Sequence, residues 1–256
     1  DDGELYGVAA PFTWVAAVDE VGCFRQKAAP MKLFIANKNY SSWSLRPWVL
    51  MRTLGIPFEE ELIEFNGLDN YREFRSFSPT GTVPCLVDGS RTIWDSLGIT
   101  LYLADRYDTV WPAESLAKAW AQCVTCEMHS GFAALRHDCP MNIGVRVSPR
   151  PMRVLLQRDV ARIRELFEQG LEQFGGPFLA GLDFTAADAF FAPVCYRVRT
   201  YGLELGPLGA RWVERMLDLP AMREWEAGAL AETYREKGHE AELAESGVIT
   251  ADYRAH

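Results

Sequence analysis

The sequence has few cysteines, few basic residues and no long apolar run. Six cysteines among 256 residues are too few for a fold stapled by disulfides, so a reducing compartment is expected. Lys and Arg total 26 against 35 Asp and Glu, and the formal net charge of −9 excludes nucleic-acid binding through a generally basic surface. No stretch approaches the ~18 consecutive apolar residues of a membrane span. We therefore expect a cytoplasmic protein that binds neither nucleic acid nor membrane.

The first thirty residues differ from the rest of the chain. They open with the acidic residues Asp1, Asp2 and Glu4, whereas a secretory signal opens with basic residues. Met31 then begins a clean strand pattern. We interpret residues 1–30 as an extension outside the native fold, and a genuine N-terminal arm is the alternative.

From Met31 to about residue 109 the pattern alternates between strand and helix. An Asp-Gly pair between two apolar runs predicts a hairpin turn. The predicted elements, in order, are a strand over Leu33–Asn37, a helix over Ser44–Gly55, a strand over Phe58–Phe65, a short helix over Tyr71–Phe77, a hairpin of Val83–Val87 and Thr92–Trp94, and a helix over Asp95–Tyr107. This order predicts a small α/β domain.

After Trp111 the strand signals stop and amphipathic helical spacing continues. The predicted helices are Glu114–Arg136, Pro149–Phe174, Ala186–Tyr201, Leu208–Leu217 and Pro220–Glu236. We therefore predict an all-helical second domain, joined to the first near Asp108–Pro112.

A serine-rich segment, Asn39–Pro47, is the first candidate for chemistry. A strand leads into this segment and a helix leads out of it. The first turn of a helix stabilises an anion, so a hydroxyl of Ser41 or Ser42 could hold a thiolate there. An ordinary helix cap is the alternative.

Two further motifs could hold a peptide. A cis bond between Val83 and Pro84 would turn the Val83 backbone toward an extended ligand, and a plain strand-initiating proline is the alternative. At the start of a predicted helix, Asp95 could hold an ammonium group while Ser96 and the free amides hold a carboxylate. The alternative there is again an ordinary N-cap.

The order and spacing of these motifs resemble the cytosolic glutathione transferases over Met31–Glu236, and the serine turn resembles that of the bacterial zeta-type members. A fourth match is the family's capping box, which Thr185 and Asp188 resemble. The resemblance implies the glutathione transferase fold, with a thioredoxin-like domain over residues 31–109 that binds glutathione. It also implies an all-helical domain over residues 110–256 that carries the electrophile site.

The resemblance implies roles for individual residues as well. Ser41 or Ser42 would contact the glutathione sulfur, since the zeta-type pattern points to Ser41 and the delta and theta pattern to Ser42. Thr82, Val83 and Pro84 would bind glutathione, and the backbone of Val83 would pair with the cysteinyl unit. Asp95 and Ser96 would hold the γ-glutamyl end.

The sequence departs from the family pattern at two positions. Trp43 stands where zeta-type and beta-class members have a cysteine, so we expect no cysteine chemistry from this turn. Thr82 stands where many members have a lysine for the glycyl carboxylate. That end of glutathione would then be held by Lys38 or Asn39, or only weakly.

We therefore expect a detoxifying glutathione transferase that conjugates its co-substrate glutathione to a small hydrophobic electrophile, as a homodimer and without a metal. The alternatives are a glutathione-dependent cis–trans isomerase of the maleylacetoacetate or maleylpyruvate type, and a non-catalytic protein of the same fold that binds glutathione or a partner protein. A weaker alternative is thiol chemistry at Cys23, Cys85 or Cys123. Position alone suggests Met128, Phe132 and Tyr201 as electrophile contacts.

Overall fold

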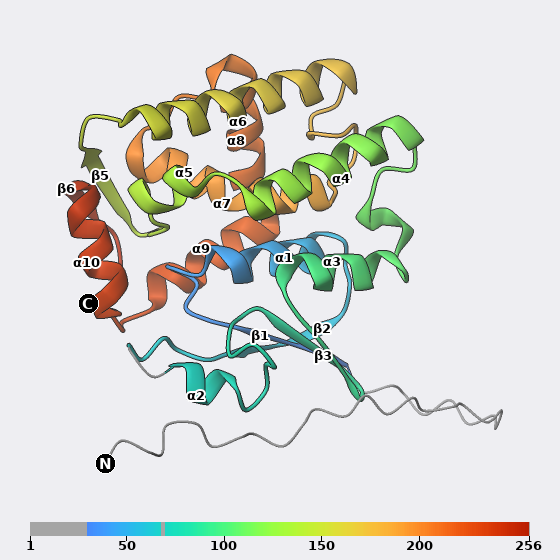
Figure 1. The fold of residues 1–256 in the computed structure, drawn as a ribbon, viewed down its shortest axis with the longest axis horizontal. Helices are drawn as coiled ribbons and strands as arrows, with labels where there is room; N and C mark the ends of the chain where they lie inside the picture. The colour runs from blue at the N-terminus through green and yellow to red at the C-terminus, as the bar shows by residue number, and fades with distance from the viewer. Residues whose placement is uncertain (1–29, 68–69, 256) are drawn as a thin grey trace, which may run out of the picture.

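The structure, a computed structural model, describes residues 30–67 and 70–255. The interpretation of residues 1–30 as an extension falls, apart from Pro30, outside the described residues. The described chain has a sheet-containing part followed by a mainly helical part (Figure 1). This arrangement confirms the predicted fold class.

Four strands form the sheet of the first part in the order β2-β1-β3-β4. They are β1 (Met31–Ile35), β2 (Phe58–Leu62), β3 (Cys85–Asp88) and β4 (Arg91–Ile93). β1 pairs in parallel with β2 and antiparallel with β3, and β3 pairs antiparallel with β4. The carboxyl ends of β1, β2 and β4 and the amino end of β3 therefore meet at the same end of the sheet, called the site end below.

Three helices accompany this sheet, namely α1 (Ser42–Thr53), α2 (Asn70–Phe74) and α3 (Ser96–Ala104). Figure 1 shows α1 and α3 between the sheet and the helical part, and α2 on the opposite side. Side chains of β1 alternate in burial, as the two-residue period of a strand requires. Leu33 and Ile35 are fully buried, whereas Phe34 on the other face stacks on Phe77 with ring centroids 4.3 Å apart.

A short 3₁₀ turn, η1 (Asp108–Val110), leads into the helical part. Its helices are α4 (Ser115–Ser130), α5 (Ala133–Asp138), α6 (Val154–Gln173), α7 (Ala186–Tyr201), α8 (Gly206–Asp218), α9 (Pro220–Ala231) and α10 (Lys237–Ser246). The single helix predicted over Glu114–Arg136 is wrong, because α4 ends at Ser130 and Phe132 adopts a left-handed φ of 58°. A left-handed residue cannot continue a right-handed helix.

The structure adds one sheet that the sequence did not predict. β5 (Val145–Pro149) pairs antiparallel with β6 (Gly247–Asp252), so the second part is helical but not all-helical. β5 occupies the start of the helix predicted over Pro149–Phe174, which begins only at Val154. The extended backbone favoured before proline explains the delay, since Pro149 and Pro151 follow one another closely.

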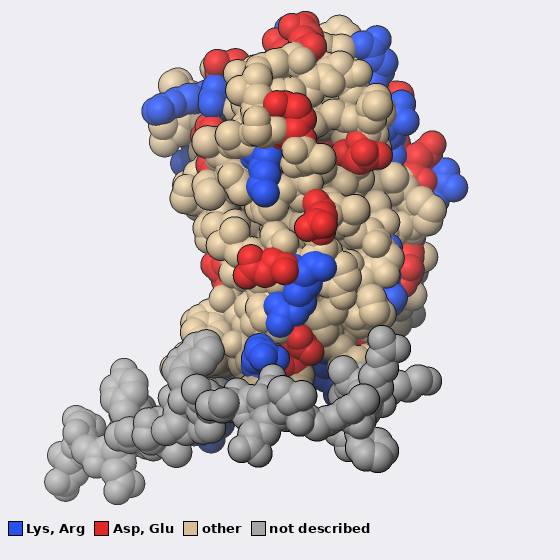
Figure 2. Space-filling view, turned by 90° about the vertical axis from the view of Figure 1, so that its right-hand side faces the viewer, with Lys and Arg blue, Asp and Glu red and all other residues tan. Residues whose placement is uncertain are grey.

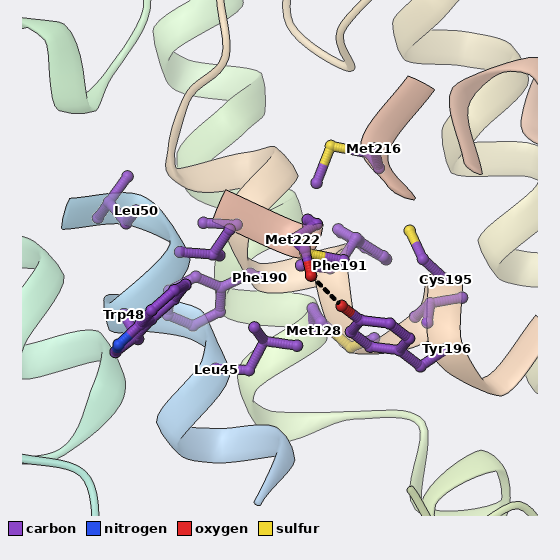
Figure 3. Packing of buried hydrophobic residues seen from close by; sticks show 14 of the residues in the cluster. Leu45, Trp48, Leu50, Met128, Phe190, Phe191, Cys195, Tyr196, Met216 and Met222 are labelled. Carbon is purple, nitrogen blue, oxygen red and sulfur yellow. Dashed lines mark hydrogen bonds between the residues drawn. The ribbon is translucent and has the colours of Figure 1, made fainter. Parts of the chain in front are cut away.

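The core joins the two parts of the chain, because α1 packs against α7 and α9. Figure 3 shows Leu45 and Trp48 of α1 on the same side of this core as Phe190 of α7. The Tyr196 hydroxyl, also on α7, donates a 2.8 Å hydrogen bond to the carbonyl of Met222 on α9. These contacts fix the start of α1, and with it the serine turn, against the helical part.

The predicted capping box at the start of α7 is confirmed. Thr185 and Asp188 bond reciprocally, and the Asp188 carboxylate also accepts the Leu179 N–H and the Trp212 indole N–H, both at 2.9 Å. Asp188 is fully buried. The box therefore ties the start of α7 to the loop before it and to α8.

The outer surface carries mixed charge. On the face that Figure 2 shows, acidic and basic side chains are intermingled over a largely uncharged surface. Within residues 30–67 and 70–255, no helix combines the length and the apolar character needed to span a membrane.

Candidate functional site

The site end of the sheet gathers the three predicted motifs. Ser42 begins α1 just after β1, Val83 precedes β3, and Asp95 follows β4. These residues are distant in sequence, yet the strand directions bring them to one end of the sheet. The peptide bond between Val83 and Pro84 is cis, as the motif suggested. β3 pairs with β1 only from Cys85 onward, so Val83 lies outside the strand ladder.

Ser41 is the N-cap of α1. Its hydroxyl accepts the Ser44 N–H at 3.3 Å and donates to the Ser44 hydroxyl at 2.7 Å. The Ser44 hydroxyl in turn accepts the Ala36 N–H. The Ser41 proton is therefore engaged in a buried capping network, which is the plainer of the two roles considered for this residue.

Ser42 is in a different position. It is the first residue of α1, and its hydroxyl has no hydrogen-bond partner within residues 30–67 and 70–255. Its side chain lines a cavity of about 470 Å³. An anion placed in this cavity would meet a free hydroxyl at the positive end of a 12-residue helix.

This cavity, called the thiol cavity below, lies between the two parts of the chain. The sheet part contributes Ser41, Ser42 and Trp43 of the serine turn and Thr82 and Val83 of the proline loop. Arg136, Pro140, Met141, Arg197, His239 and Glu242 contribute from the helical part. Pro84 is buried behind the loop. The volume of the thiol cavity is in the usual range for small-molecule sites.

Asp95 lines a second cavity of about 470 Å³, and Thr82 borders both cavities. The Asp95 carboxylate caps α3 by accepting the Leu97 N–H at 2.9 Å, and its other oxygen lies 3.2 Å from His129 Nε2. Ser96 is fully buried, and its hydroxyl has no partner among the described residues. The two members of the predicted pair are thus unequal, since Asp95 faces the cavity and the Ser96 hydroxyl lies beneath it.

Lys38 and Asn39 do not line the thiol cavity. The Lys38 ammonium pairs with Glu60 at 2.7 Å and lies over the Trp48 ring. The Asn39 amide bonds to Asn142, and its oxygen accepts the N–H groups of Ile143 and Gly144. Both side chains are committed to the core, so their expected role at the glycyl carboxylate is wrong.

Arginines on the helical side give the thiol cavity a positive wall. Arg136 and Arg197 line it, and Arg46 lies beneath, with its guanidinium 4.2 Å from the Trp43 ring centroid. No carboxylate of the described residues forms an ion pair with any of the three. Burial and the neighbouring Arg136 lower the pKa of Arg197 to about 10. The pKa of Arg46 is also lowered, first by burial and then by the charges of Arg136 and Arg197.

The suggested electrophile contacts lie outside this cavity and stay a prediction. Met128, Phe132 and Tyr201 do not line the thiol cavity, and the Tyr201 hydroxyl donates to the Pro140 carbonyl. Sequence reasoning missed Arg136, Arg197 and His239. A charged residue among the apolar residues of α7 was a usable signal for Arg197, because an unpaired buried charge is costly and rarely accidental.

The cysteine alternatives receive little support from their surroundings. Burial raises the pKa of the Cys85 thiol to about 11, which disfavours a reactive thiolate. Cys123 and Cys126 lie within α4 and do not line the thiol cavity. Cys23 lies outside the described residues.

Comparisons with known proteins identify the family of both parts of the chain. Residues 40–106 match the model of the glutathione S-transferase N-terminal domain, and residues 153–228 match that of the C-terminal domain. A zeta-class glutathione S-transferase of Euphorbia esula is 30% identical over 157 residues, which cover 60% of this chain and 70% of the relative. The chain belongs to the glutathione S-transferase family.

Solved transferase-fold structures share the fold of this glutathione S-transferase family member. A glutathione transferase homolog from Burkholderia gl BGR1 with bound glutathione superposes with a TM-score of 0.60 at 20% identity, covering 78% of this chain and 98% of the other. Ure2p in complex with glutathione gives a TM-score of 0.60 at 20% identity, covering 79% of this chain and 96% of the other. At these identities, the likeness establishes the fold alone.

Proposed function

We propose that this family member is a glutathione transferase that activates the glutathione thiol at Ser42. The observation that carries the proposal is the unpartnered Ser42 hydroxyl at the start of α1, facing the thiol cavity. A hydroxyl and a helix N-terminus favour the thiolate over the thiol, which has an ordinary pKa of ~8.5. The nearby guanidinium groups add to the same effect.

Glutathione would lie across the site end of the sheet. Its cysteinyl backbone would pair with Val83, and its γ-glutamyl ammonium would meet the Asp95 carboxylate, beside Thr82 and Pro84. The first turn of α3, including the N–H of Ser96, would meet the γ-glutamyl carboxylate. The proposal thus assigns glutathione to residues 31–109 and the electrophile to residues 110–256.

The reaction is attack of the thiolate on an electrophilic carbon. A carbon–sulfur bond forms, the leaving group departs with its electron pair, and the thiol proton passes to solvent. Holding the two reactants in one cavity supplies much of the rate. Family resemblance adds a homodimer and a cytoplasmic location to the proposal.

Calorimetric titration with glutathione tests the proposal, followed by assays with neutral aromatic and aliphatic electrophiles. We expect micromolar to millimolar binding and consumption of glutathione with at least one electrophile. Binding without any turnover would favour the non-catalytic alternative. No binding at millimolar glutathione would overturn the proposal.

A second function is favoured by the guanidinium groups of Arg136 and Arg197. They suit an electrophile that carries a carboxylate, as the substrate of a cis–trans isomerase does in the maleylacetoacetate type. The thiolate would add to the double bond, the carbon–carbon bond would rotate, and the thiolate would leave again. Such a reaction converts the alkene while the glutathione concentration stays constant, which separates it from conjugation in one assay.

A further inference from the structure

The last residues of the chain reach back to the site end of the sheet. We call residues 232–254 the C-terminal return; it contains α10 and β6 and lies beyond the family match, which ends at residue 228. The Glu232 carboxylate accepts the backbone N–H of Lys38 at 2.6 Å. Glu240 on α10 accepts the Tyr40 hydroxyl at 2.8 Å. The return therefore holds the segment that leads into Ser42.

The return reaches the thiol cavity through two side chains, Glu242 and His239. The His239 ring stacks on Tyr40 and packs at a tilt against Phe65, with centroid distances of 4.9 Å in both pairs. Its Nδ1 lies 2.7 Å from a Glu236 oxygen, and since an ionised carboxylate only accepts, Nδ1 carries the proton. The Nε2 atom has no partner within the described part of the chain.

Sheet order determines which end of glutathione would approach His239. In the order β2-β1-β3-β4, Asp95 follows the strand at one edge, and Phe65 follows β2 at the other. Ser42 and Val83 lie between them. If the γ-glutamyl end lies at Asp95, as the proposed function has it, an extended tripeptide places its glycyl carboxylate on the Phe65 side, where His239 packs.

We infer that His239 binds the glycyl carboxylate of glutathione, in place of the lysine that Thr82 replaces. This inference rests on the proposed function. A second carboxylate at Nε2 would hold the imidazolium form between Glu236 and the ligand. Lys38 is already paired with Glu60. Arg136 and Arg197 also line the cavity from the helical part, but it is His239 that packs against Phe65, the residue after β2. Glu242, also at the cavity, is exposed to solvent, and the ion pair of His239 among the described residues is with Glu236.

Binding of two ligands to three variants tests the inference. The ligands are glutathione and its C-terminal amide, which lacks only the glycyl charge. His239→Phe keeps a ring against Tyr40 and Phe65 but removes the N–H, and His239→Gln keeps a donor. Lys237→Ala, an exposed change on the same helix, is the control. Thermal unfolding confirms that each variant is folded.

Wild type and Lys237→Ala should bind glutathione about ten- to hundredfold more tightly than the amide, as for a charge-assisted hydrogen bond. His239→Phe should abolish that preference and leave amide binding unchanged, and His239→Gln should restore part of it. An unchanged preference in His239→Phe would overturn the inference while leaving the proposed function intact. Absence of glutathione binding by the wild type would instead overturn both.

Discussion

The Glu232 carboxylate accepts the backbone N–H groups of Lys38 at 2.6 Å and of Asn39 at 3.2 Å. These partners lie 194 and 193 residues away in sequence. Two backbone donors of the loop before the serine turn therefore depend on one side chain after α9. The same carboxylate is partly buried, and burial raises its pKa.

Glu232→Ala should lower the free energy of unfolding by about 1–3 kcal/mol, because it leaves buried N–H groups without an acceptor. Chemical denaturation measures this loss. Glu224→Ala is the matched control, since Glu224 is exposed and pairs with Arg52 at 3.4 Å on the surface; we expect a change below about 1 kcal/mol there. Equal losses in the two variants would contradict the structural role of Glu232.

Ser42→Ala should raise the pKa of bound glutathione toward the ~8.5 of a free thiol, because it removes the hydroxyl that would hold the thiolate. The ultraviolet absorbance of the thiolate, followed against pH, measures this shift. We expect turnover at neutral pH to fall about tenfold or more, which corresponds to the loss of one hydrogen bond to a charged group.

Ser41→Ala is the companion variant. Its hydroxyl caps α1 through Ser44, so the expected effect is a loss of about 1 kcal/mol in stability with the thiolate titration unchanged. A shift of that titration in Ser41→Ala, and none in Ser42→Ala, would reverse the assignment and favour the zeta-type pattern.

Much of the sheet-side geometry follows from sequence, because it depends on local signals in a known order. Ser42, Val83 and Asp95 each stand at a junction between a strand and a turn or helix, and the alternation of elements fixes which junctions share one end of the sheet. The choice between Ser41 and Ser42 did not follow from the motif. It depends on the hydrogen bond from Ser41 to Ser44, which is a matter of side-chain placement.

The helical wall was harder to predict because its contacts are distant in sequence. Helical spacing identifies a buried face but not which element lies against it, so Arg197 could not be assigned to the cavity of Ser42. His239 lies further still from the serine turn and enters through α10, which no motif signalled. Likewise, β6 pairs with β5 across about a hundred residues, and neither strand has a strong local pattern.

Arg197→Met should weaken binding of a carboxylate-bearing electrophile by about tenfold or more and leave the KM of a neutral electrophile unchanged. The guanidinium lines the thiol cavity without an acidic partner, so its charge is available to a ligand. Arg199→Met serves as the control, because Arg199 lies two residues on in α7 and pairs with Glu226 at 2.7 Å. Equal effects on charged and neutral substrates would argue against a carboxylate site.

Asp188 gives a pH dependence of stability with a defined sign. Burial raises its pKa from 3.8 to about 6 despite three N–H donors to the carboxylate. The folded state therefore favours the protonated form. This contribution is complete below the unfolded pKa near 3.8 and is lost as the pH rises through about 6. A shift of two units corresponds to about 3 kcal/mol.

Asp188→Asn cannot ionise, so its stability should lack this component of the pH dependence. At neutral pH the variant should be less stable than wild type, because one amide oxygen cannot replace a carboxylate that meets the N–H groups of Leu179, Thr185 and Trp212. At acidic pH the difference should be larger, because the wild type then gains the additional stability of its protonated form. Urea unfolding at several pH values measures both proteins. The stability advantage of the wild type should shrink by about 2 kcal/mol between about pH 4 and about pH 7. An advantage that stays constant or grows with pH would show that the carboxylate is ionised in the folded protein at acidic pH, held by its three donors.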